Sequence, residues 1–295
     1  MDNMKPLFAI PGDKALEQKV YLIKEITQPY FSTEFHFHHE CQLVYVVESA
    51  GRRIIGDNIS YFESGELIFV GSGTPHVWHN EQKYFEGKDK LQARSLALYI
   101  SPDLLVEHLS PFANTSTVKT WLKKAQRGIQ FHGKAKAEIL ALMRQMLEQQ
   151  DLLQTISFMT LMQKMMATKE YKLLAGTNYV NLYNDKDQSR MDDIFKYIFR
   201  HFKRDIPLSE IAAVAGINVH SFCRFFKSRT QKSFTHFVNE LRIGYACRLL
   251  QEKEMSMVEL SNKCGYRNTT HFNRFFKKIK GKTPREYKRE VTSLD

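Results

Sequence analysis

Two short stretches of the chain carry polar and basic side chains of the kinds that recognise DNA. Arg and Asn have the donors and acceptors that read G and A edges in the major groove, and Lys contacts phosphates. The first stretch contains His220, Ser221, Cys223, Arg224 and Lys227, and the second contains Thr269, Thr270, Asn273, Arg274 and Lys278. We predict that these residues face outward from two helices and form a DNA-contacting surface.

The elements that would position these residues are visible as an internal repeat. "CRFFK" ends at Lys227 and "NRFFK" ends at Lys277, an offset of 50 residues, and the offset is 49 between Gly216 and Gly265. The repeat spans about 35 residues, and such self-similarity marks a structural unit that is used twice. Each copy has phenylalanines at i, i+3 and i+4, the spacing of one helix face, so we expect all of them to face a core. They are Phe222, Phe225 and Phe226 in the first copy and Phe272, Phe275 and Phe276 in the second.

Each copy is predicted to be a short helix, a tight turn and a second helix. Gly216 and Gly265 stand where the chain must reverse, a position that often requires a positive φ angle. Asn218 and Asn268 are suited to cap the second helices. Residues 233–250 have apolar residues at helical spacing, so one further helix is expected to join the two motifs. Two such motifs could enter successive major grooves about 34 Å apart on one face of the DNA.

The net charge of the chain is divided unevenly along its length. Residues 1–185 carry 20 Lys and Arg against 20 Asp and Glu, whereas residues 186–295 carry 23 against 12. The whole formal charge of +11 therefore lies in the segment that holds the repeat. A basic half beside a neutral half indicates a polyanionic partner, either nucleic acid or an anionic membrane. No signal peptide and no apolar run near the ~18 residues of a membrane span is found, so we expect a cytoplasmic protein without a membrane partner.

The repeat resembles a known family. "SEIAAVAGINVHSFCRFFKSRTQKSF" and "VELSNKCGYRNTTHFNRFFKKIKGKTPREY" are similar to the tandem helix-turn-helix domain of the AraC/XylS family of bacterial transcription regulators. The resemblance implies sequence-specific binding to double-stranded promoter DNA, usually as an activator, with RNA polymerase as a further partner. It places the base-reading positions on His220, Cys223 and Arg224 in the first motif, and on Thr269, Thr270, Asn273 and Arg274 in the second.

The amino-terminal part of the chain is predicted to be mainly β. From Lys19 to Ile100, short apolar runs alternate with turn signals, as in an all-β sandwich or barrel. His36 and His38 alternate in "FHFHHECQ", so they share one face of an extended segment. Together with "GELIFVGSGTPHVWHN", this stretch resembles the small cupin domain that often precedes an AraC-type domain. The resemblance implies a small-molecule effector pocket lined by His36, His38, Gln42 and His76.

The same resemblance raises the question of a metal. In cupin enzymes the three corresponding histidines and an acidic residue hold a divalent metal. Gln42 stands at the acidic position unless Glu40 replaces it, and a neutral amide lacks the charge that such a cation favours. Three imidazoles can still bind zinc or iron. We therefore expect an organic effector and no cofactor. A divalent metal at His36, His38 and His76, or histidines that merely pack in the barrel mouth, are the alternatives.

Beyond Ser101 and Pro102, which open a helix, the pattern becomes helical. Residues 137–150 and 151–167 have apolar residues at three- and four-residue steps, which predicts an antiparallel helical hairpin. The second stretch is richer in Leu, Ile and Met than one covering face needs, and methionine surfaces adapt to partners. We therefore expect a homodimer through residues 135–168. Residues 176–189 are polar and aperiodic, and Ser189 is expected to cap a helix that continues to Phe202.

Together these patterns predict an α+β protein with two domains. Residues 1–175 would form a cupin-like effector-binding and dimerisation domain, with a β-barrel and a helical hairpin. Residues 176–188 would be a linker, and residues 189–295 an all-α tandem helix-turn-helix domain. The predicted function is a ligand-responsive, sequence-specific transcription regulator that is not an enzyme. The alternatives are a metal-dependent cupin enzyme tethered to a DNA-binding domain, and a protein that binds nucleic acid without sequence specificity.

Overall fold

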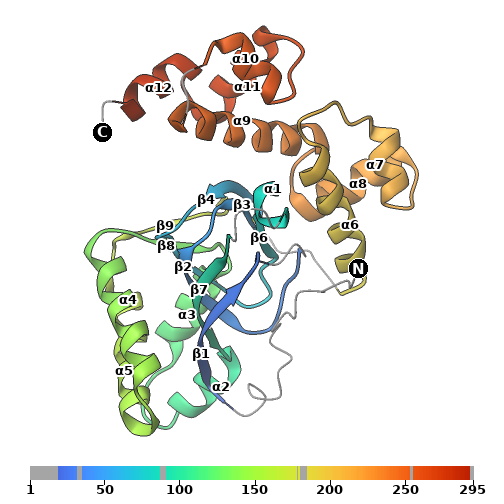
Figure 1. The fold of residues 1–295 in the computed structure, drawn as a ribbon. Coiled ribbons are helices and arrows are strands. Elements are labelled where there is room, and N and C mark those ends of the chain that lie inside the picture. Colours follow the sequence, from blue (N-terminus) through green and yellow to red (C-terminus); the bar gives the residue numbers. More distant parts are fainter. Residues whose placement is uncertain are drawn as a thin grey trace. The chain divides into compact units, whose positions relative to one another are not determined.

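The computed structural model describes residues 19–31, 35–86, 91–177, 179, 185–252 and 255–292 (Figure 1). The chain divides into two compact units, one made of Met1–Asn58 and Phe62–Asn181 and the other of Ile59–Tyr61 and Leu182–Asp295. The amino-terminal half holds antiparallel sheets and helices, and the carboxy-terminal unit is helical. The predicted α+β architecture in two parts is confirmed. Among the described residues, no helix has both the length and the apolarity to cross a membrane.

The described strands form two sheets. The larger has six strands in the order β1-β7-β2-β5-β8-β9, and the smaller has three in the order β4-β3-β6. Strand β2 pairs antiparallel with both β5 and β7, and β3 pairs antiparallel with β6. The strands are β1 (Tyr21–Gln28), β2 (Cys41–Glu48), β3 (Gly51–Ile55), β4 (Asn58–Phe62), β5 (Leu67–Val70), β6 (His76–Asn80), β7 (Ala93–Ile100), β8 (Ile129–Phe131) and β9 (Tyr171–Leu173). The predicted closed cupin barrel is not confirmed, because the hydrogen bonding divides these strands between two sheets.

The larger sheet is covered on both faces. Along β2, Cys41 and Leu43 are buried in a core that includes the helices, whereas Val44 and Val46 are buried in a second core that includes the smaller sheet. Successive residues of a strand point to opposite faces, so the nearly continuous apolar run "CQLVYVVE" suits a sheet that is buried on both sides. The smaller sheet and the helices therefore lie on opposite faces of the larger sheet.

The helices of this half are α1 (Gln82–Phe85), α2 (Pro102–Leu109), α3 (Ser116–Ala125), α4 (Gly133–Glu148) and α5 (Asp151–Ala167). Helices α4 and α5 pack against each other, which confirms the predicted helical hairpin. The Gln154 side chain closes its turn, because Nε2 donates hydrogen bonds to the carbonyl oxygens of Met146 and Gln149 at 2.8 and 3.0 Å. Pro102 is the first residue of α2, as predicted, where its missing N–H would have had no helical partner.

The carboxy-terminal unit contains α6 (Asp185–His201), α7 (Leu208–Val214), α8 (Val219–Thr230), α9 (Phe234–Glu252), α10 (Met257–Lys263), α11 (Thr269–Lys280) and α12 (Pro284–Thr292). Helix α9 is the predicted joining helix. Phe195 of α6 packs against Phe226 of α8 and Phe237 of α9, with ring centroids 6.3 and 5.3 Å apart. A second core contains buried residues of α9, α10 and α11, including Ile243, Leu260 and Phe276.

The predicted start of α6 is wrong. The helix begins at Asp185, so Ser189 lies inside it and does not cap it. No Gly or Pro stands between residues 185 and 189, and nothing in that segment stops a helix from starting a turn earlier. The last residues of the predicted linker 176–188 are therefore helical, while residues 178 and 180–184 of that linker lie outside the described part of the chain.

Candidate nucleic-acid interface and histidine cluster

Each predicted motif is a pair of helices joined by a turn that contains a left-handed glycine. Gly216, between α7 and α8, has a φ of +66°, and Gly265, between α10 and α11, has a φ of +81°. The next residue donates its N–H to a carbonyl five residues earlier in both turns: Ile217 to Ala212 at 3.1 Å and Tyr266 to Ser261 at 3.0 Å. This bond satisfies a carbonyl at the end of the first helix. The predicted requirement for glycine is confirmed in both copies.

The second helix of each motif begins at the asparagine that was predicted to cap it. Oδ1 of Asn218 accepts a hydrogen bond from the N–H of Ser221 at 2.9 Å, and Oδ1 of Asn268 accepts one from Thr270 at 2.7 Å. Each bond satisfies one of the backbone donors that lack a partner within the first helical turn. The side chains therefore fix where α8 and α11 start, and hence which residues their first turns present.

Two phenylalanines of each predicted aromatic trio are fully buried, namely Phe222, Phe226, Phe272 and Phe276. Phe225 and Phe275 are only partly buried, but Phe275 packs against the core that contains residues of α9, α10 and α11, so the prediction that it faces a core is confirmed. The residue at i+3 lies further around the helix than the residue at i+4, at the edge of the apolar stripe. Guanidinium groups lie over both rings: Arg229 is 5.5 Å from the Phe225 centroid, and Arg274 is 5.4 Å from that of Phe275.

All ten predicted DNA-contacting residues lie on α8 or α11. Ser221 and Thr269 are partly buried, and the other eight are exposed: His220, Cys223, Arg224, Lys227, Thr270, Asn273, Arg274 and Lys278. Each helix thus presents a polar and basic surface that begins at its amino-terminal end, which is how a recognition helix meets the major groove. Sequence reasoning missed Arg267 and His271, which are exposed beside this surface. Arg267 directly precedes the capping residue of α11, and this position could have indicated from the sequence that it lies near the predicted DNA-contacting surface.

Helix α9 fixes the two motifs to one frame. The buried hydroxyl of Tyr266, in the second motif's turn, donates to Oδ1 of Asn239 on α9 at 2.6 Å. Arg242 of α9 donates through Nε to the carbonyl of Phe202, and through a terminal nitrogen to that of Arg204, both at 2.7 Å. Those carbonyls follow the end of α6, which packs on the first motif. The hydrogen bonds of α9 therefore connect the turn of one motif to the helix that supports the other.

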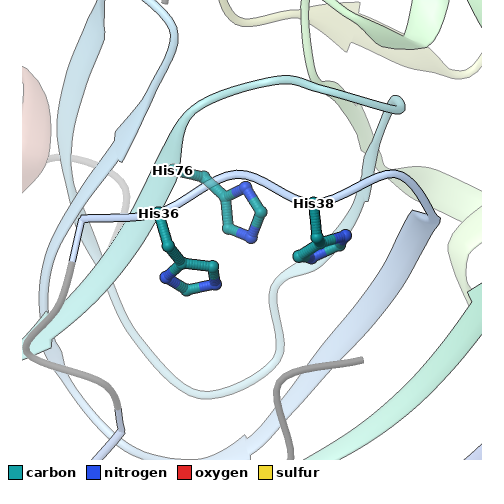
Figure 2. A group of neighbouring side chains, drawn as sticks. All are labelled: His36, His38 and His76. Atoms are coloured by element: carbon teal, nitrogen blue, oxygen red, sulfur yellow. The ribbon is translucent and has the colours of Figure 1, made fainter. Parts of the chain in front are cut away.

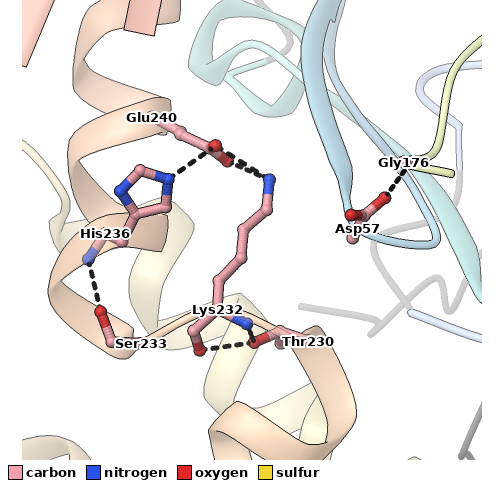
Figure 3. Close-up of polar contacts among 7 residues, drawn as sticks. All are labelled: Asp57, Gly176, Thr230, Lys232, Ser233, His236 and Glu240. Atoms are coloured by element: carbon pink, nitrogen blue, oxygen red, sulfur yellow. Dashed lines mark hydrogen bonds and ion pairs between the residues drawn. The ribbon is translucent and has the colours of Figure 1, made fainter. Parts of the chain in front are cut away.

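The repeat extends beyond the recognition helices. Nζ of Lys232 lies 2.9 and 2.6 Å from the two carboxylate oxygens of Glu240 (Figure 3), and Lys282 pairs with Glu290 at the equivalent place in the second copy. Nε2 of His236 is 3.1 Å from the same Glu240 carboxylate. In both copies the residue that ends the recognition helix has a left-handed φ, +57° in the first copy and +76° at Gly281 in the second. The two copies therefore leave their recognition helices in the same way.

In the amino-terminal unit, the structure brings His36, His38 and His76 together (Figure 2). One ring nitrogen from each lies within 4.8 Å of the others. His36 and His38 belong to the segment before β2, and His76 is the first residue of β6. The backbones of His36 and His76 exchange hydrogen bonds of 3.1 and 2.8 Å, so the isolated bridge between them holds the cluster in place.

Hydrogen bonds fix which nitrogen carries the proton in two of the three rings. Nδ1 of His76 lies 2.7 Å from the carbonyl oxygen of Thr74, and Nδ1 of His38 lies 2.9 Å from that of Glu40. Because a carbonyl only accepts, both Nδ1 atoms must donate, which leaves the Nε2 lone pairs available. Nε2 of His76 is buried and has no hydrogen-bond partner among the described residues. Burial and the neighbouring His36 lower the pKa of His38 to about 4 and that of His76 well below its usual value.

The remaining predicted pocket residue, Gln42, lies on β2 and donates through Nε2 to the hydroxyl of Tyr99 at 3.1 Å. The group of possible metal ligands does not include Glu40. Its carboxylate lies 3.5 Å from Nδ1 of His38, the nitrogen that donates to a backbone carbonyl. Neutral imidazoles whose Nδ1–H donates to a backbone carbonyl are the form in which histidine binds a metal. The ligands of one tetrahedral zinc ion lie about 3.3 Å apart, so this donor set fits a divalent metal after a small closure.

A cleft of about 690 Å³ lies elsewhere in this unit and was not predicted from the sequence. Its walls come from β1, α2 and α5 and include Tyr21, Phe112, Thr155 and Met159. Tyr21 stacks on Phe158 with ring centroids 4.1 Å apart, and its hydroxyl lies 3.2 Å from Oγ1 of Thr155. No motif in the sequence marks this cleft, because it forms where three elements meet and its lining residues are typical of a core edge.

Comparison with known proteins matches residues 211–290 to a helix-turn-helix domain family. The chain is 26% identical over 263 residues to the uncharacterized HTH-type transcriptional regulator YdeC of Bacillus subtilis, covering 86% of this chain and 85% of that protein. It is 22% identical over 258 residues to the HTH-type transcriptional activator RhaS of an Enterobacter strain, covering 84% and 85%. A solved transcriptional regulator with an AraC-type DNA-binding domain, from Chromobacterium violaceum, is 23% identical with a TM-score of 0.34, covering 37% of this chain and 96% of that chain. The two longer matches extend well beyond the helix-turn-helix region into the amino-terminal unit.

Proposed function

We propose that this chain, a transcription regulator whose helix-turn-helix domain is of the AraC type, reads promoter DNA with α8 and α11 and responds to an effector bound at the histidine cluster. The observation that carries the DNA part is the pair of capped, polar recognition helices held in one unit by α9. The net charge of +11 in residues 186–295 supports contact with phosphates. An activating role is supported by relatives that are named activators, and RNA polymerase is the partner we propose for that role.

A binding-site selection tests the DNA contacts. The full-length chain selects duplexes from a random-sequence library, and fluorescence anisotropy then compares variants on selected and on random DNA. Arg274→Ala is expected to weaken binding to selected DNA by about 1–3 kcal/mol, because a base contact is lost. Lys278→Ala is the matched control and is expected to weaken binding to selected and to random DNA alike. It should also reduce the slope of log affinity against log salt concentration by about 1. Equal losses on both DNAs when Thr269, Thr270 and Asn273 are replaced together by Ala would refute base reading.

The effector site of this proposal consists of the three histidines and Gln42, at the end of the cupin-like pair of sheets. Two classes of ligand suit it. An organic molecule could accept or donate hydrogen bonds at the imidazoles and the amide. A divalent transition metal such as zinc suits the Nε2 atoms, and the buried, unpartnered Nε2 of His76 favours it. Three neutral ligands leave coordination positions open, so a metal held here could itself bind an organic effector.

Metal binding is measured directly by calorimetry with Zn²⁺ and by the visible spectrum of the Co²⁺ form. The full-length chain is expected to bind one equivalent, and the double variant His36→Ala with His76→Ala is expected to bind none. The matched control replaces His39 and His79, two histidines outside the cluster, by Ala. If the control loses the metal and the cluster variant keeps it, the metal assignment is wrong. If wild type binds no metal, the organic class remains for the same residues.

A homodimer through α5 is the third part of the proposal. Leu161, Met162 and Met165 of this helix pack in the core, but four large apolar residues of α5 are exposed. They are Leu152, Leu153, Ile156 and Met159, with exposed fractions of 71, 63, 53 and 38%. Neighbouring apolar side chains on one exposed helix commonly mark an interface with another protein, and a second copy brings the same surface.

A metal-dependent cupin enzyme joined to a DNA-binding domain is the second candidate, and the histidine cluster is the observation that favours it. The carboxylate that would complete an enzyme-type site is replaced by Gln42, and Glu40 does not join the cluster. The relatives over both units are transcription regulators. The two candidates differ in what the His36→Ala and His76→Ala variant loses: the regulator loses an effector response, whereas the enzyme loses turnover.

A further inference from the structure

The segment that leaves the amino-terminal unit is anchored to one particular turn. Strands β3 and β4 are joined by the two-residue loop of Gly56 and Asp57. Oδ1 of Asp57 accepts a hydrogen bond from the backbone N–H of Gly176 at 2.9 Å (Figure 3). The ring of Tyr179 covers Gly56 so closely that a Cβ on that glycine would lie 2.8 Å from Cζ of Tyr179. We call these four residues the linker anchor, since Gly176 and Tyr179 begin the segment that leads to α6.

The same turn is hydrogen-bonded to the strand that carries His76. Ile55, the last residue of β3, is the register partner of His76 on β6. The N–H of Gly56 donates to the carbonyl oxygen of Pro75, the residue before His76, at 2.9 Å. His76 is in turn bridged through its backbone to His36. Thus one antiparallel strand pair has His76 of the histidine cluster on one strand and the turn of the linker anchor at the end of the other.

We propose that the linker anchor is the output of the histidine cluster: occupation of the cluster shifts β6 against β3 and changes how tightly Asp57 holds Gly176. The inference rests on the proposed function, because it takes the histidine cluster as the sensing site. The two-state element is the hydrogen bond from Gly176 to Asp57, which is either formed or open. A ligand changes the populations of these two states only if it binds one of them more tightly.

The geometry suits such a relay in three ways. The His76 ring is buried and its Nδ1 is held by the carbonyl oxygen of Thr74 at 2.7 Å, so a ligand that draws the three ring nitrogens together pulls on the backbone of β6. The hydrogen bond from Gly176 lies at an exposed place, where a single bond opens easily. The hydroxyl of Tyr179 is buried without a hydrogen-bond partner among the described residues, so it adds no hydrogen bond that would stabilise the closed state of the anchor.

A second attachment of the same segment defines where the response should end. The guanidinium of Arg127 donates to the carbonyl oxygen of Ala175 at 2.8 and 3.1 Å, and the N–H of Ala175 donates to the carbonyl of Arg127 at 2.8 Å. These bonds involve neither β3 nor β6. We therefore expect hydrogen exchange to change at Gly176 when the histidine cluster is occupied. No change is expected in the β8–β9 pair, which precedes this second attachment.

Hydrogen exchange of the full-length chain, followed by mass spectrometry of the peptide that contains residues 174–179, tests the relay. Asp57→Ala is expected to make the Gly176 amide exchange about five- to tenfold faster, because its acceptor is lost. Asp57→Asn is the conservative variant, because it keeps an acceptor oxygen. Its Gly176 amide is expected to exchange at close to the wild-type rate. Glu63→Ala removes the same charge from another turn of the same half and serves as the control for charge alone.

The decisive comparison is between His76→Ala and His79→Ala. His76 takes no part in the hydrogen bond between Asp57 and Gly176, and His79 lies further along the same strand. The relay predicts a several-fold change in exchange at Gly176 for His76→Ala and none for His79→Ala. Zn²⁺ is the probe in a second arm, with binding measured by calorimetry, and it should change the exchange of wild type but not of Asp57→Ala. Unchanged exchange at Gly176 in His76→Ala overturns the relay, whether or not Zn²⁺ binds. Failure of wild type to bind Zn²⁺ overturns only the proposal that the histidine cluster holds a metal.

Discussion

The two turn glycines allow one substitution to be compared in two copies of the same motif. Replacement of Gly216 or Gly265 by Ala places a Cβ on a residue with a φ of +66° or +81°, which costs about 1 kcal/mol. A Cβ at Gly216 would meet no atom of the described residues within 4 Å, so that cost stands alone. A Cβ at Gly265 would lie 2.6 Å from the carbonyl oxygen of Lys203 and 2.7 Å from its carbonyl carbon.

Backbone atoms cannot rotate away from such an overlap, so either the turn or the segment after α6 must move. We expect Gly216→Ala to lower the free energy of unfolding by about 1 kcal/mol, and Gly265→Ala to lower it by roughly 3 kcal/mol. Because the turn at Gly265 sets the start of α11, the same variant should also weaken binding to selected DNA more than Gly216→Ala does.

Urea unfolding of the full-length chain measures the difference with an internal reference. Both tryptophans, Trp78 and Trp121, belong to the amino-terminal unit, so their fluorescence follows that unit alone. Far-ultraviolet circular dichroism also follows the helical carboxy-terminal unit. Gly265→Ala is expected to move the helical transition down by about 2 M urea while the fluorescence midpoint stays in place. Equal shifts for the two glycine variants would show that the contact with Lys203 has no energetic consequence, and the reasoning would fail.

Two further predictions concern the amino-terminal unit. Leu152→Asp with Ile156→Asp should convert a dimer to a monomer in sedimentation at micromolar concentration, with Gln163→Asp on the same helix as control; a wild type that is already monomeric contradicts the interface. Burial lowers the pKa of His38 and of His79 to about 4, whereas the unfolded chain titrates near 6.5. The unfolded state thus binds more protons between about pH 6.5 and pH 4, so the stability of this unit is fully present above that window and falls through it. The urea concentration at the midpoint of the tryptophan fluorescence transition should be lower at about pH 5 than at about pH 7, and the decrease should be smaller in His79→Gln. An equal midpoint at the two pH values would contradict the assignment to these histidines.

The features predicted correctly from the sequence are those that depend on local chemistry. A left-handed turn needs glycine, and a helix start needs a side-chain acceptor, so Gly216, Gly265, Asn218 and Asn268 could be assigned without knowing any tertiary contact. The repeat strengthened these assignments because each position was seen twice. The three histidines could be brought together only through the family resemblance, since His76 is 38 residues from His38 and spacing alone does not join them.

The features that were missed depend on how elements meet. Alternation along β2 indicates which side chains share a face, but it does not indicate which strands pair, and so the pattern alone left a sandwich of two sheets and a barrel both open. Phe225 and Phe275 have the residue type of the core, but helical spacing alone does not show how much of the i+3 position the neighbouring elements leave exposed. The cleft between β1, α2 and α5 and the contact of Asp57 with Gly176 join positions more than 100 residues apart. No local pattern records such contacts.

The frame around α9 constrains how the protein can meet DNA. Tyr266 and Arg242 connect this helix to the turn of the second motif and to the end of α6, which supports the first. The two recognition helices therefore cannot rotate independently without breaking these hydrogen bonds, and breaking the buried one between Tyr266 and Asn239 costs about 1–3 kcal/mol when a partner is left unsatisfied. In the proposed function, the distance between the two recognised DNA elements is then set by the protein, and DNA whose grooves do not match must bend to fit. In that proposed function, an effector signal that arrives through the linker enters α6, whose Phe195 packs on Phe226 of the first motif, and the hydrogen bonds of α9 connect that motif to the second.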